Sequence, residues 1–304
     1  MENKTILFGG SGLLGPVILE KFPDIVSVGR TPPPSYIKNA HVSINSLDEL
    51  DKIDSLEFDS VIFLIGSSDH HLINSHPTMG IDYNVVLLKK ALNYFKTRNI
   101  KKFICFTTIL LYKARDSMLP CNESHPINPY VNDYVFSKHL SEEVIRFYKD
   151  SVPSIIMRCS NIYGPTRLVR PDLIPTLIQD SYSCDSVSVW NKKPQRDFIY
   201  LEDAADAIVS LIDTDYTGIV NLGTGATTSV GEISNIIEKL SGKKVVDLEK
   251  KVKGPMYFQC DTTLLYDLTG WKPKYTLDQG IEKTYKRMGV WKNENLWPNK
   301  VMTS

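Results

Sequence analysis

Short apolar runs alternate with segments of helical apolar spacing along most of the 304-residue chain. The apolar runs predict buried strands, which we expect at residues 5–8, 25–28, 60–65, 102–107, 154–159 and 219–222. Helical spacing predicts helices near residues 13–22, 83–97, 134–149, 203–213 and 229–240. Strands that alternate with helices favour a parallel sheet covered on both faces. We therefore predict an α/β protein with a doubly wound parallel sheet.

Two segments interrupt this alternation. The segment from Gly164 to about Tyr200 is richer in proline and polar residues, and the chain after Ser241 also departs from the pattern. We expect these pieces to form a smaller, C-terminal lobe that binds a substrate. The predicted division is a main domain of residues 1–163 with about 200–225, and a second lobe of residues 164–199 and 226–304.

Composition and charge narrow the class of protein. The chain is 42% hydrophobic, which is ordinary for a soluble globular protein. It has 35 basic and 35 acidic residues, so no global field attracts nucleic acid or an anionic membrane. Apolar stretches such as 61–65 are far too short to span a bilayer, and no signal peptide precedes the first strand. We expect neither a nucleic-acid partner nor a membrane.

Cysteine and histidine spacing argues against a metal site. The five cysteines form no C-x-x-C pair, which fits a reducing cytoplasm and predicts a cytoplasmic protein. His70 and His71 could resemble a ligand pair, but adjacent loop residues rarely converge on one ion. We therefore interpret both histidines as structural and expect no bound metal.

A glycine-rich turn separates the first predicted strand from the first predicted helix. The spacing of its glycines lets the backbone turn tightly, approach a pyrophosphate and pack helix against strand. The phosphates would then face the helix N-terminus. This pattern predicts a dinucleotide site formed by Gly9, Ser11, Gly12, Leu13, Leu14 and Gly15.

The end of the second predicted strand bears on which dinucleotide binds. An acidic residue there binds the ribose 2′-hydroxyl of NAD, whereas an arginine accommodates the 2′-phosphate of NADP. The chain reads Gly29-Arg30-Thr31, without an acid. Because Arg30 can pair with a phosphate that a carboxylate would repel, we predict NADP or NADPH. The alternative is that Arg30 is solvated and NAD binds through other contacts.

Two threonines and a Tyr–Lys pair are typical of hydride-transfer chemistry. Tyr134 and Lys138 are four residues apart and share one helix face, which places an ammonium beside a phenol. The cation favours the phenolate, so the tyrosine can exchange a proton nearer neutral pH than its usual pKa of about 10 allows. Thr107 and Thr108 end an apolar run, where a hydroxyl can hold the carbonyl oxygen that receives the proton. We identify Thr108, Tyr134 and Lys138 as candidate catalytic residues, and Thr107, Tyr134 and Lys138 as candidate cofactor contacts.

Seven motifs follow one another from Ile6 to about Tyr285: Gly9-x-x-Gly12-x-x-Gly15, Thr108, Tyr134 with Lys138, Arg158-x-x-Asn161-x-Tyr163-Gly164-Pro165, Arg196-Asp197-Phe198-Ile199 with Asp203, Asn221-Leu222-Gly223-Thr224-Gly225, and Gly270-Trp271-Lys272-Pro273. In this order they resemble the extended short-chain dehydrogenase/reductases, the group of sugar-nucleotide epimerases, dehydratases and reductases. The resemblance implies a Rossmann fold and a nucleotide-sugar substrate, and the sequence is identified as a member of this family.

The resemblance also implies substrate contacts. Asn161 would contact the sugar diphosphate, and the fork of Arg196 would pair with a phosphate. Three residues would line the nucleotide base: Leu173, Val189 and Trp190. The alternative for Trp190 is core packing. Asn84 would support a proton-relay water or the active-site helix, or else make only a structural hydrogen bond.

Departures from the family pattern narrow the reaction. Family dehydratases carry an Asp-Glu pair after the triad threonine, where this chain has Ile109 and Leu110, which cannot do acid–base work. The 3,5-epimerase/4-reductases place a cysteine and a histidine where this chain has Leu110 and Thr166. Many relatives also have an arginine about ten residues before the aspartate that is here Asp261. This chain has Lys251 and Lys253 instead.

Two reactions remain. One is NADPH-dependent reduction of a nucleotide-linked 4-keto-6-deoxy sugar at C4, with Tyr134 as proton donor. The other is C4 epimerisation with bound NAD. Arg30 favours the reductase, because family epimerases usually hold NAD with an acid after the second strand. A third reading, a non-catalytic nucleotide-binding protein, is disfavoured by the complete triad of Thr108, Tyr134 and Lys138.

The resemblance further implies a homodimer. In relatives, the helices that correspond to 83–97 and 134–149 form a four-helix bundle across a two-fold axis. Six apolar residues on these helices exceed what one core face requires: Val86, Leu87, Tyr94, Leu140, Val144 and Phe147. The alternative is that all of them pack against the protein's own sheet.

Overall fold

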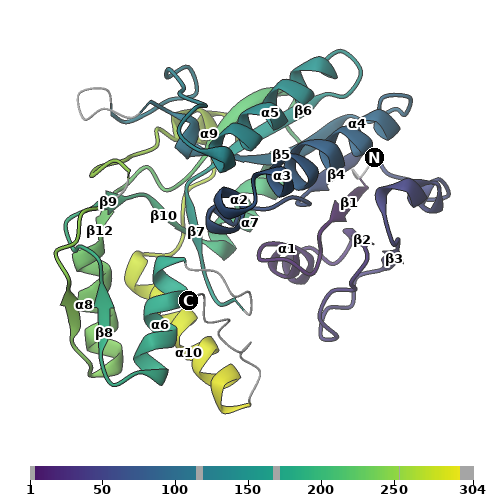
Figure 1. The fold of residues 1–304 in the computed structure, drawn as a ribbon. Coiled ribbons are helices and arrows are strands. Elements are labelled where there is room, and N and C mark those ends of the chain that lie inside the picture. The colour runs from purple at the N-terminus through teal and green to yellow at the C-terminus, as the bar shows by residue number, and fades with distance from the viewer. Residues whose placement is uncertain (1–3, 114–118, 167–171, 253, 295–304) are drawn as a thin grey trace.

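A seven-stranded sheet, parallel throughout, forms the centre of the molecule (Figure 1). The structure is a computed structural model that describes residues 4–113, 119–166, 172–252 and 254–294. Across the sheet the strands are β11 (Gly218–Leu222), β6 (Ser154–Cys159), β5 (Lys102–Thr108), β4 (Ser60–Phe63), β1 (Thr5–Phe8), β2 (Val26–Gly29) and β3 (His41–Ser43). From β1 the chain adds β2 and β3 on one side and the remaining strands on the other. This order confirms the predicted doubly wound, Rossmann-like sheet.

All six predicted strands are present, and the sequence pattern missed only one strand of this sheet. The missed strand, β3, contains a single apolar residue, Val42, and therefore shows no apolar run. It forms at the sheet edge, where Val42 pairs with Val28 of β2. The strand forms by backbone pairing with β2. A pattern of apolar residues gives no sign of such pairing.

Alternate residues of the central strands face two apolar cores. The flanking helices are α1 (Gly15–Lys21), α7 (Leu201–Ser210), α4 (Leu87–Phe95) and α5 (Asp133–Phe147), with the 3₁₀ segment η1 (Leu47–Ile53). Leu7 and Ile62 belong to the core that contains α1 and α7. Phe8 and Phe63, one residue further along the same strands, belong to the core that contains α4 and α5. This alternation requires a helix layer on each face of the sheet.

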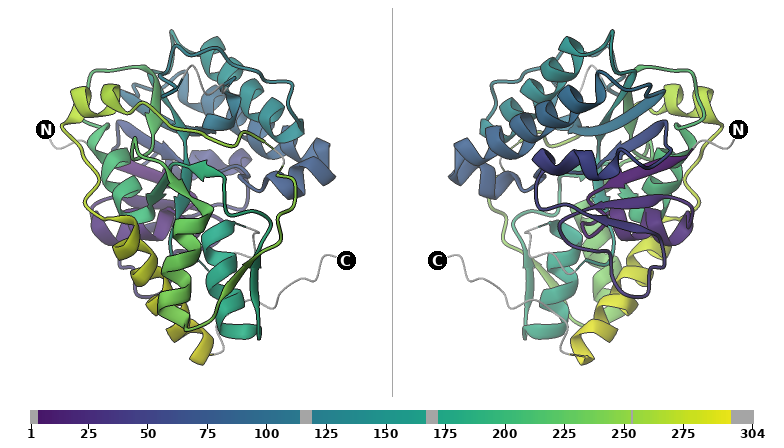
Figure 2. Two further views of the ribbon diagram at one scale, coloured as in Figure 1. Left: turned by 90° about the vertical axis from the view of Figure 1, so that its left-hand side faces the viewer. Right: turned by 90° about the vertical axis from the view of Figure 1, so that its right-hand side faces the viewer.

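Three helices of the C-terminal half pack together beyond the sheet. They are α6 (Leu173–Ser183), α8 (Val230–Ser241) and α10 (Leu277–Asn293), and each contacts the other two. Figure 2 shows them grouped at the lower end of the molecule, away from the blue helices of the other core. Two strands, β8 (Val187–Val189) and β13 (Val245–Asp247), pair in parallel beside them. All five elements lie within residues 164–199 and 226–304.

Helix α6 was not predicted, because proline and polar residues dominate its surroundings in the sequence. Its proline, Pro175, lies in the first turn, where the missing N–H has no helical partner to lose. Ile174, Leu177 and Ile178 are buried in the same core as α1 and α7. Tertiary burial therefore stabilises a helix that the local sequence only weakly favours.

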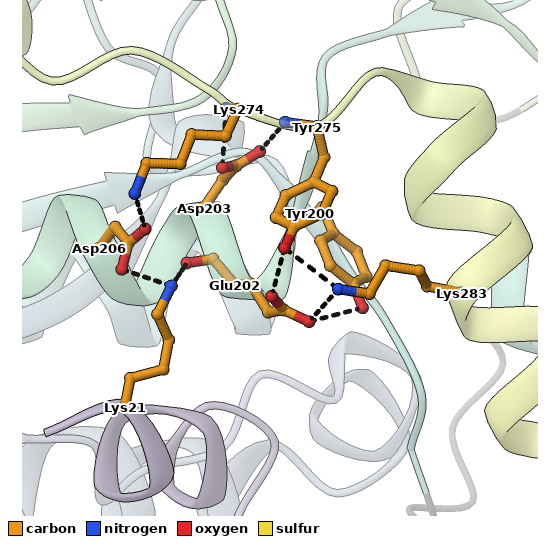
Figure 3. A network of polar contacts seen from close by, with 8 residues as sticks. All are labelled: Lys21, Tyr200, Glu202, Asp203, Asp206, Lys274, Tyr275 and Lys283. Carbon is orange, nitrogen blue, oxygen red and sulfur yellow. Dashed lines mark hydrogen bonds and ion pairs between the residues drawn. The ribbon is translucent and has the colours of Figure 1, made fainter. Parts of the chain in front are cut away.

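A polar network joins this lobe to the sheet domain (Figure 3). Asp206 of α7 pairs with Lys21 of α1 at 2.5 Å and with Lys274 at 2.9 Å. The buried carboxylate of Asp203 accepts the backbone N–H groups of Lys274 and Tyr275, at 2.9 Å and 3.1 Å. The network fixes the segment before α10 against α7, because Asp203 satisfies backbone donors that would otherwise be buried without a partner.

The remaining elements are short. They are α2 (His70–Ser75), α3 (Pro77–Gly80), the π-helical segment η2 (Ile81–Val86), the 3₁₀ segment η3 (Ile109–Leu111), α9 (Thr263–Thr269), and the strands β7 (Asn161–Tyr163), β9 (Gln195–Arg196), β10 (Phe198–Tyr200) and β12 (Thr228–Ser229). In the described part of the chain, none of the helices has the length and apolar character needed to cross a membrane.

Candidate functional site

The predicted glycine turn lies between β1 and α1, and it needs glycine at two positions. Gly9 has φ of +93°, a conformation that disfavours a side chain, and its carbonyl accepts the N–H of Gly12 at 3.1 Å. A Cβ on Gly15 would overlap the Gly9 carbonyl oxygen and the backbone of Gly10. The start of α1 therefore packs directly on the end of β1.

The surface of this turn fits a dinucleotide phosphate. Ser11 and Gly12 are exposed, Leu13 is half-buried, and Leu14 is buried at the helix N-cap. The Leu14 side chain makes no capping hydrogen bond, so it leaves the N–H groups of the first turn available for an anion. A bound NAD or NADP would be held here, and its nicotinamide would carry the hydride.

Arg30 lies directly after β2, at the carboxyl edge of the sheet. Its side chain is exposed, and no ion pair within the described residues engages it. Gly29 before it and Thr31 after it carry no charge, so the strand end is cationic.

The two threonines at the end of β5 point to different partners. Thr108 is buried, and its hydroxyl oxygen accepts the backbone N–H of Leu110 at 3.2 Å, which leaves its own proton available to donate. The hydroxyl of Thr107 donates to the buried carboxylate of Glu142 at 2.9 Å. The Thr107 hydroxyl therefore donates to α5. We expect the predicted cofactor contact to come from the main chain of Thr107.

Helix α5 brings the predicted Tyr–Lys pair to the same edge. Asn132 caps the helix by accepting the N–H of Val135 at 2.9 Å. Tyr134 and Lys138 are 5% and 7% exposed, and the Lys138 ammonium lies 6.0 Å from the Tyr134 ring centre. The structure thus places the ammonium beside the phenol, as the i, i+4 spacing predicts.

Lys138 is held by two acceptors from other elements. Its ammonium donates to Asn84 Oδ1 at 3.3 Å and to the carbonyl of Phe106 in β5 at 3.4 Å. Burial lowers the pKa of Lys138 to about 8, because desolvation disfavours the charged form. The lysine therefore changes charge close to neutral pH.

Asn84 is a structural anchor for the catalytic helix. Its Oδ1 accepts both Lys138 and the N–H of Ser67, the latter at 2.8 Å, and its Nδ2 donates to Ser137 Oγ at 3.0 Å. Ser141 Oγ also donates to the Asn84 carbonyl at 2.9 Å. Asn84 lies in the π-helical segment η2, and such segments occur often at functional sites. These bonds are structural hydrogen bonds, which is the second of the two roles expected for Asn84.

The residues predicted to contact the substrate, Asn161 and Arg196, lie on the short strands β7 and β9. Asn161 Nδ2 donates to the carbonyl of Asp197 at 2.8 Å, which joins β7 to the β9–β10 segment. The guanidinium of Arg196 is half-buried, and burial lowers its pKa. The fully buried Asp197 accepts the backbone N–H of Thr224 at 2.9 Å and that of Gly225 at 3.0 Å. Two distant motifs are therefore fixed to each other.

The three residues predicted to line a base belong to the second lobe. Leu173 begins α6 and is half-buried, whereas Val189 at the end of β8 is 4% exposed. Trp190, the next residue, is 56% exposed, so core packing does not explain it. Lys251 is exposed, and Lys253 lies outside the described residues.

A family model described as "NAD dependent epimerase/dehydratase family" matches residues 5–223, most of the chain. The chain belongs to the NAD-dependent epimerase/dehydratase family. It is 27% identical to "UDP-glucose 4-epimerase 4" of Oryza sativa subsp. japonica, over 85% of this chain and 77% of that protein. It is 25% identical to "Probable GDP-L-fucose synthase 1" of the same organism, over 97% and 93%.

Solved structures agree with this assignment at the level of the fold. An epimerase from Methanothermobacter thermautotrophicus superposes with a TM-score of 0.86 at 18% identity, covering 96% of this chain and 94% of that one. As a member of this family, the chain is an NAD(P)-dependent enzyme of the oxidoreductase type. Among the described residues, no group of three or more His, Cys, Asp or Glu side chains could hold a metal ion.

Sequence reasoning missed a buried acid on α5, Glu142. It binds both Thr107 and Arg158, so it ties α5 to β5 and β6. Glu142 follows Lys138 by four residues, and that spacing could have indicated an acid on the sheet-facing side of the helix. Sequence reasoning also set His70 aside, although its ring centre lies 6.1 Å from that of Tyr134.

Proposed function

We propose that this enzyme reduces a nucleotide-linked 4-keto-6-deoxy sugar at C4, with NADPH as the cofactor and Tyr134 as the proton donor. The observation that carries the proposal is the exposed Arg30 at the end of β2, where no carboxylate is present to repel a 2′-phosphate. A reductase consumes NADPH at every turnover and must exchange it. An exposed arginine at the cofactor site is consistent with a cofactor that is exchanged at every turnover.

The chain's own residues supply the remaining chemistry. The reduced nicotinamide, when bound, supplies the hydride. The Thr108 hydroxyl orients the substrate carbonyl oxygen. Its oxygen accepts the N–H of Leu110, and its own proton remains to donate to the substrate. Tyr134 gives its proton to that oxygen, and the neighbouring ammonium of Lys138 stabilises the phenolate that remains.

The neighbours of Thr108 support reduction without dehydration. Ile109 is buried and Leu110 is 41% exposed, so the residues that follow the triad threonine offer no carboxylate. Removal of the C5 proton and of water needs an acid and a base at this place. Leu110 instead presents an apolar surface beside the Thr108 hydroxyl, which suits a 6-deoxy sugar.

We assign the nucleotide-sugar site to the second lobe, residues 164–199 and 226–304, and the cofactor site to residues 1–163 with about 200–225. Relatives with similar sequences are named for UDP-glucose and GDP-L-fucose, which supports a nucleotide-sugar substrate. Arg196 would pair with a phosphate, Asn161 would contact the diphosphate, and Trp190 offers an exposed ring for stacking on the base.

The second candidate is a C4 epimerase that holds NAD. The similarity to the rice protein named as a UDP-glucose 4-epimerase favours it, at 27% identity compared with 25% for the one named as a GDP-L-fucose synthase. The same triad would serve both reactions. The two differ in whether reduced cofactor is consumed.

A cofactor-consumption assay distinguishes the two reactions. The protein is incubated with NADPH and a panel of nucleotide-linked 4-keto-6-deoxy sugars, and the absorbance of the reduced cofactor is followed. A loss of absorbance with at least one sugar supports the reductase. Interconversion of UDP-glucose and UDP-galactose without added cofactor and without net absorbance change would support the epimerase and overturn the reductase.

We also propose that the enzyme is a cytoplasmic homodimer. A hollow of about 250 Å³ lies on the outer side of α4 and α5, and its lining includes Leu140, Val144 and Phe147. Phe147 is 79% exposed and Val86 is 41% exposed, which is unfavourable for an isolated chain. Part of the predicted apolar set packs inward, since Leu87, Tyr94 and Val144 contact the core beneath these helices.

A further inference from the structure

Helix α2 is attached to the first turn of the catalytic helix. The side-chain oxygen of Asn74 accepts the backbone N–H of Tyr134 at 3.1 Å. Ile73 is fully buried and packs in one cluster with Leu111, Tyr134 and Val135. These contacts fix α2 directly beside the proton donor.

The segment before α2 is attached to Asn84, which also accepts the ammonium of Lys138. The N–H of Ser67 donates to Asn84 Oδ1 at 2.8 Å, and the same oxygen accepts the Lys138 ammonium at 3.3 Å. The N–H of Asp69 donates to Ser67 Oγ at 3.2 Å, and Asp69 in turn caps α2 by accepting the N–H of Leu72 at 2.9 Å. Residues 67–75 are therefore fixed at one end by Asn84, which also holds Lys138, and at the other end by the backbone of Tyr134.

His70 lies between these two attachments and contacts the tyrosine ring. The ring centres of His70 and Tyr134 are 6.1 Å apart with an interplanar angle of 59°. The ring centre of His71 lies 4.2 Å from that of His70, with the two rings tilted by 39°. His70 is half-buried, so the residue is partly exposed to solvent while its ring contacts that of Tyr134. Where two polar groups lie farther apart than a direct hydrogen bond allows, a single water can bridge them.

Tyr134 needs a route by which its proton returns. In the proposed reduction the phenol gives its proton to the sugar oxygen, and it must regain one before the next turnover. Asn84 is poorly placed to hold a relay water, because its side-chain oxygen already accepts from Ser67 and Lys138. Imidazole is the side chain best suited to exchange protons with solvent near neutral pH.

We propose that His70 is a further catalytic residue, which returns a proton from solvent to the Tyr134 phenolate after each reduction. The step rests on the proposed function. The imidazolium N–H gives its proton to the phenolate oxygen, which forms the neutral phenol and the neutral imidazole, and the imidazole then takes a proton from water or buffer. The titratable groups beside His70 include Asp69 and His71 on its own segment and Tyr134 on α5. Lys138 lies 6.0 Å from the Tyr134 ring centre.

Steady-state kinetics of His70→Gln test the step, with His71→Gln as the matched control. Proton return follows product formation, so loss of His70 should lower kcat at least about tenfold and lower KM in parallel. The value of kcat/KM should stay nearly unchanged, and added imidazole should restore kcat. His71→Gln should behave as the wild type. A lower kcat/KM with unchanged kcat would indicate a substrate contact instead, and loss without imidazole rescue would indicate a structural role; either result overturns the proposal.

A second measurement needs no substrate and so remains informative if the proposed reductase function fails. The imidazole titrations of His70 and His71 are followed by NMR in the wild type and in Lys138→Met. An ammonium near Tyr134 disfavours the imidazolium, so its removal should raise the His70 midpoint and leave the His71 midpoint less affected. An unchanged His70 midpoint would show that this imidazole is not coupled to the catalytic pair, and the proposal would be wrong. A shifted midpoint without NADPH oxidation would leave the coupling established and reject only the reductase.

Discussion

The carboxylate of Glu142 and the guanidinium of Arg158 form a two-bond ion pair inside the molecule, with Nε–Oε1 at 2.9 Å and Nη2–Oε2 at 2.7 Å. Neither side chain is more than 2% exposed. Thr107 donates to the same carboxylate, and the Tyr112 ring lies 4.7 Å from the guanidinium. The pair joins α5 to β6 and so sets the position of the helix that carries Tyr134 and Lys138.

Removal of Glu142 should be strongly destabilising. In Glu142→Ala the guanidinium of Arg158 stays buried without its counter-charge, and breaking a buried pair in this way typically costs about 3–5 kcal/mol. The free energy of unfolding in urea measures the loss. Glu143→Ala is the control, because Glu143 is half-exposed on the same helix and its ion pair with Arg146 should contribute less than about 1 kcal/mol. Similar losses in the two variants would contradict this account.

Tyr134→Phe should abolish turnover and leave the fold and cofactor binding intact. The phenyl ring keeps the packing of Tyr134 against Leu111 and Val135, but the proton donor is lost. We expect a decrease in kcat of about two to four orders of magnitude. Tyr130→Phe, at a ring that is 80% exposed before α5, is the control and should keep wild-type activity. Retention of more than about a tenth of the activity in Tyr134→Phe would reject the assignment.

Thr108→Val should be milder than Tyr134→Phe. It removes a hydrogen bond that orients the substrate carbonyl, but the proton source remains, so we expect a loss smaller than that of the tyrosine variant. The same assay of kcat and KM measures it. An equal loss in the two variants would show that the Thr108 hydroxyl does more than orient the carbonyl.

The rate of reduction should fall as the pH rises through about 8. Burial lowers the pKa of Lys138 to about 8, so the ammonium is present below this pH and is lost above it. Without the ammonium, the Tyr134 phenol is a weaker acid and donates its proton less readily. The pH profile of kcat/KM reports groups of the free enzyme, and its alkaline limb should be absent in Lys138→Met. The same limb in both proteins would exclude Lys138 as its origin.

The sequence predicted those parts of the fold and site that depend on local spacing. Apolar runs indicate the buried strands, and an i, i+4 spacing indicates that Tyr134 and Lys138 share one face of a helix. The contacts between Glu142 and Arg158, and between His70 and Tyr134, join different elements of the fold. No local pattern encodes such contacts, because they depend on how the elements pack. Helix α6 shows the same limit, since its burial in the core shared with α1 and α7 outweighs a weak local preference.

Arg30→Asp should change the cofactor preference from NADP toward NAD. The carboxylate would repel the 2′-phosphate and could accept a hydrogen bond from a 2′-hydroxyl. Fluorescence titration of both reduced cofactors against wild type and variant measures the preference. Lys38→Asp makes the same charge change at another exposed residue and should leave the preference unchanged. If the wild type binds NADH more tightly than NADPH, the argument from Arg30 is wrong and the epimerase becomes the better candidate.

The exposed face of α4 and α5 should hold two copies of the chain together. Phe147 contributes a ring that is 79% exposed beside the hollow lined by Leu140 and Val144. Burying an aromatic ring of this kind against a second copy is worth roughly 2–3 kcal/mol per chain, whereas a charge at the same place would be buried without a partner. Light scattering at micromolar concentration should therefore give twice the 34.4 kDa of one chain.

Phe147→Glu should dissociate the dimer without unfolding the sheet, because the side chain lies outside the core beneath α5. Val290→Glu is the control: Val290 is 45% exposed on α10, in the other lobe, and its replacement should leave the mass unchanged. Tyr134 and Lys138 lie on the same helix as Phe147, so dissociation should also lower activity by loosening α5. A wild-type mass of 34.4 kDa would mean that the chain is a monomer and that this face has no copy of itself as a partner.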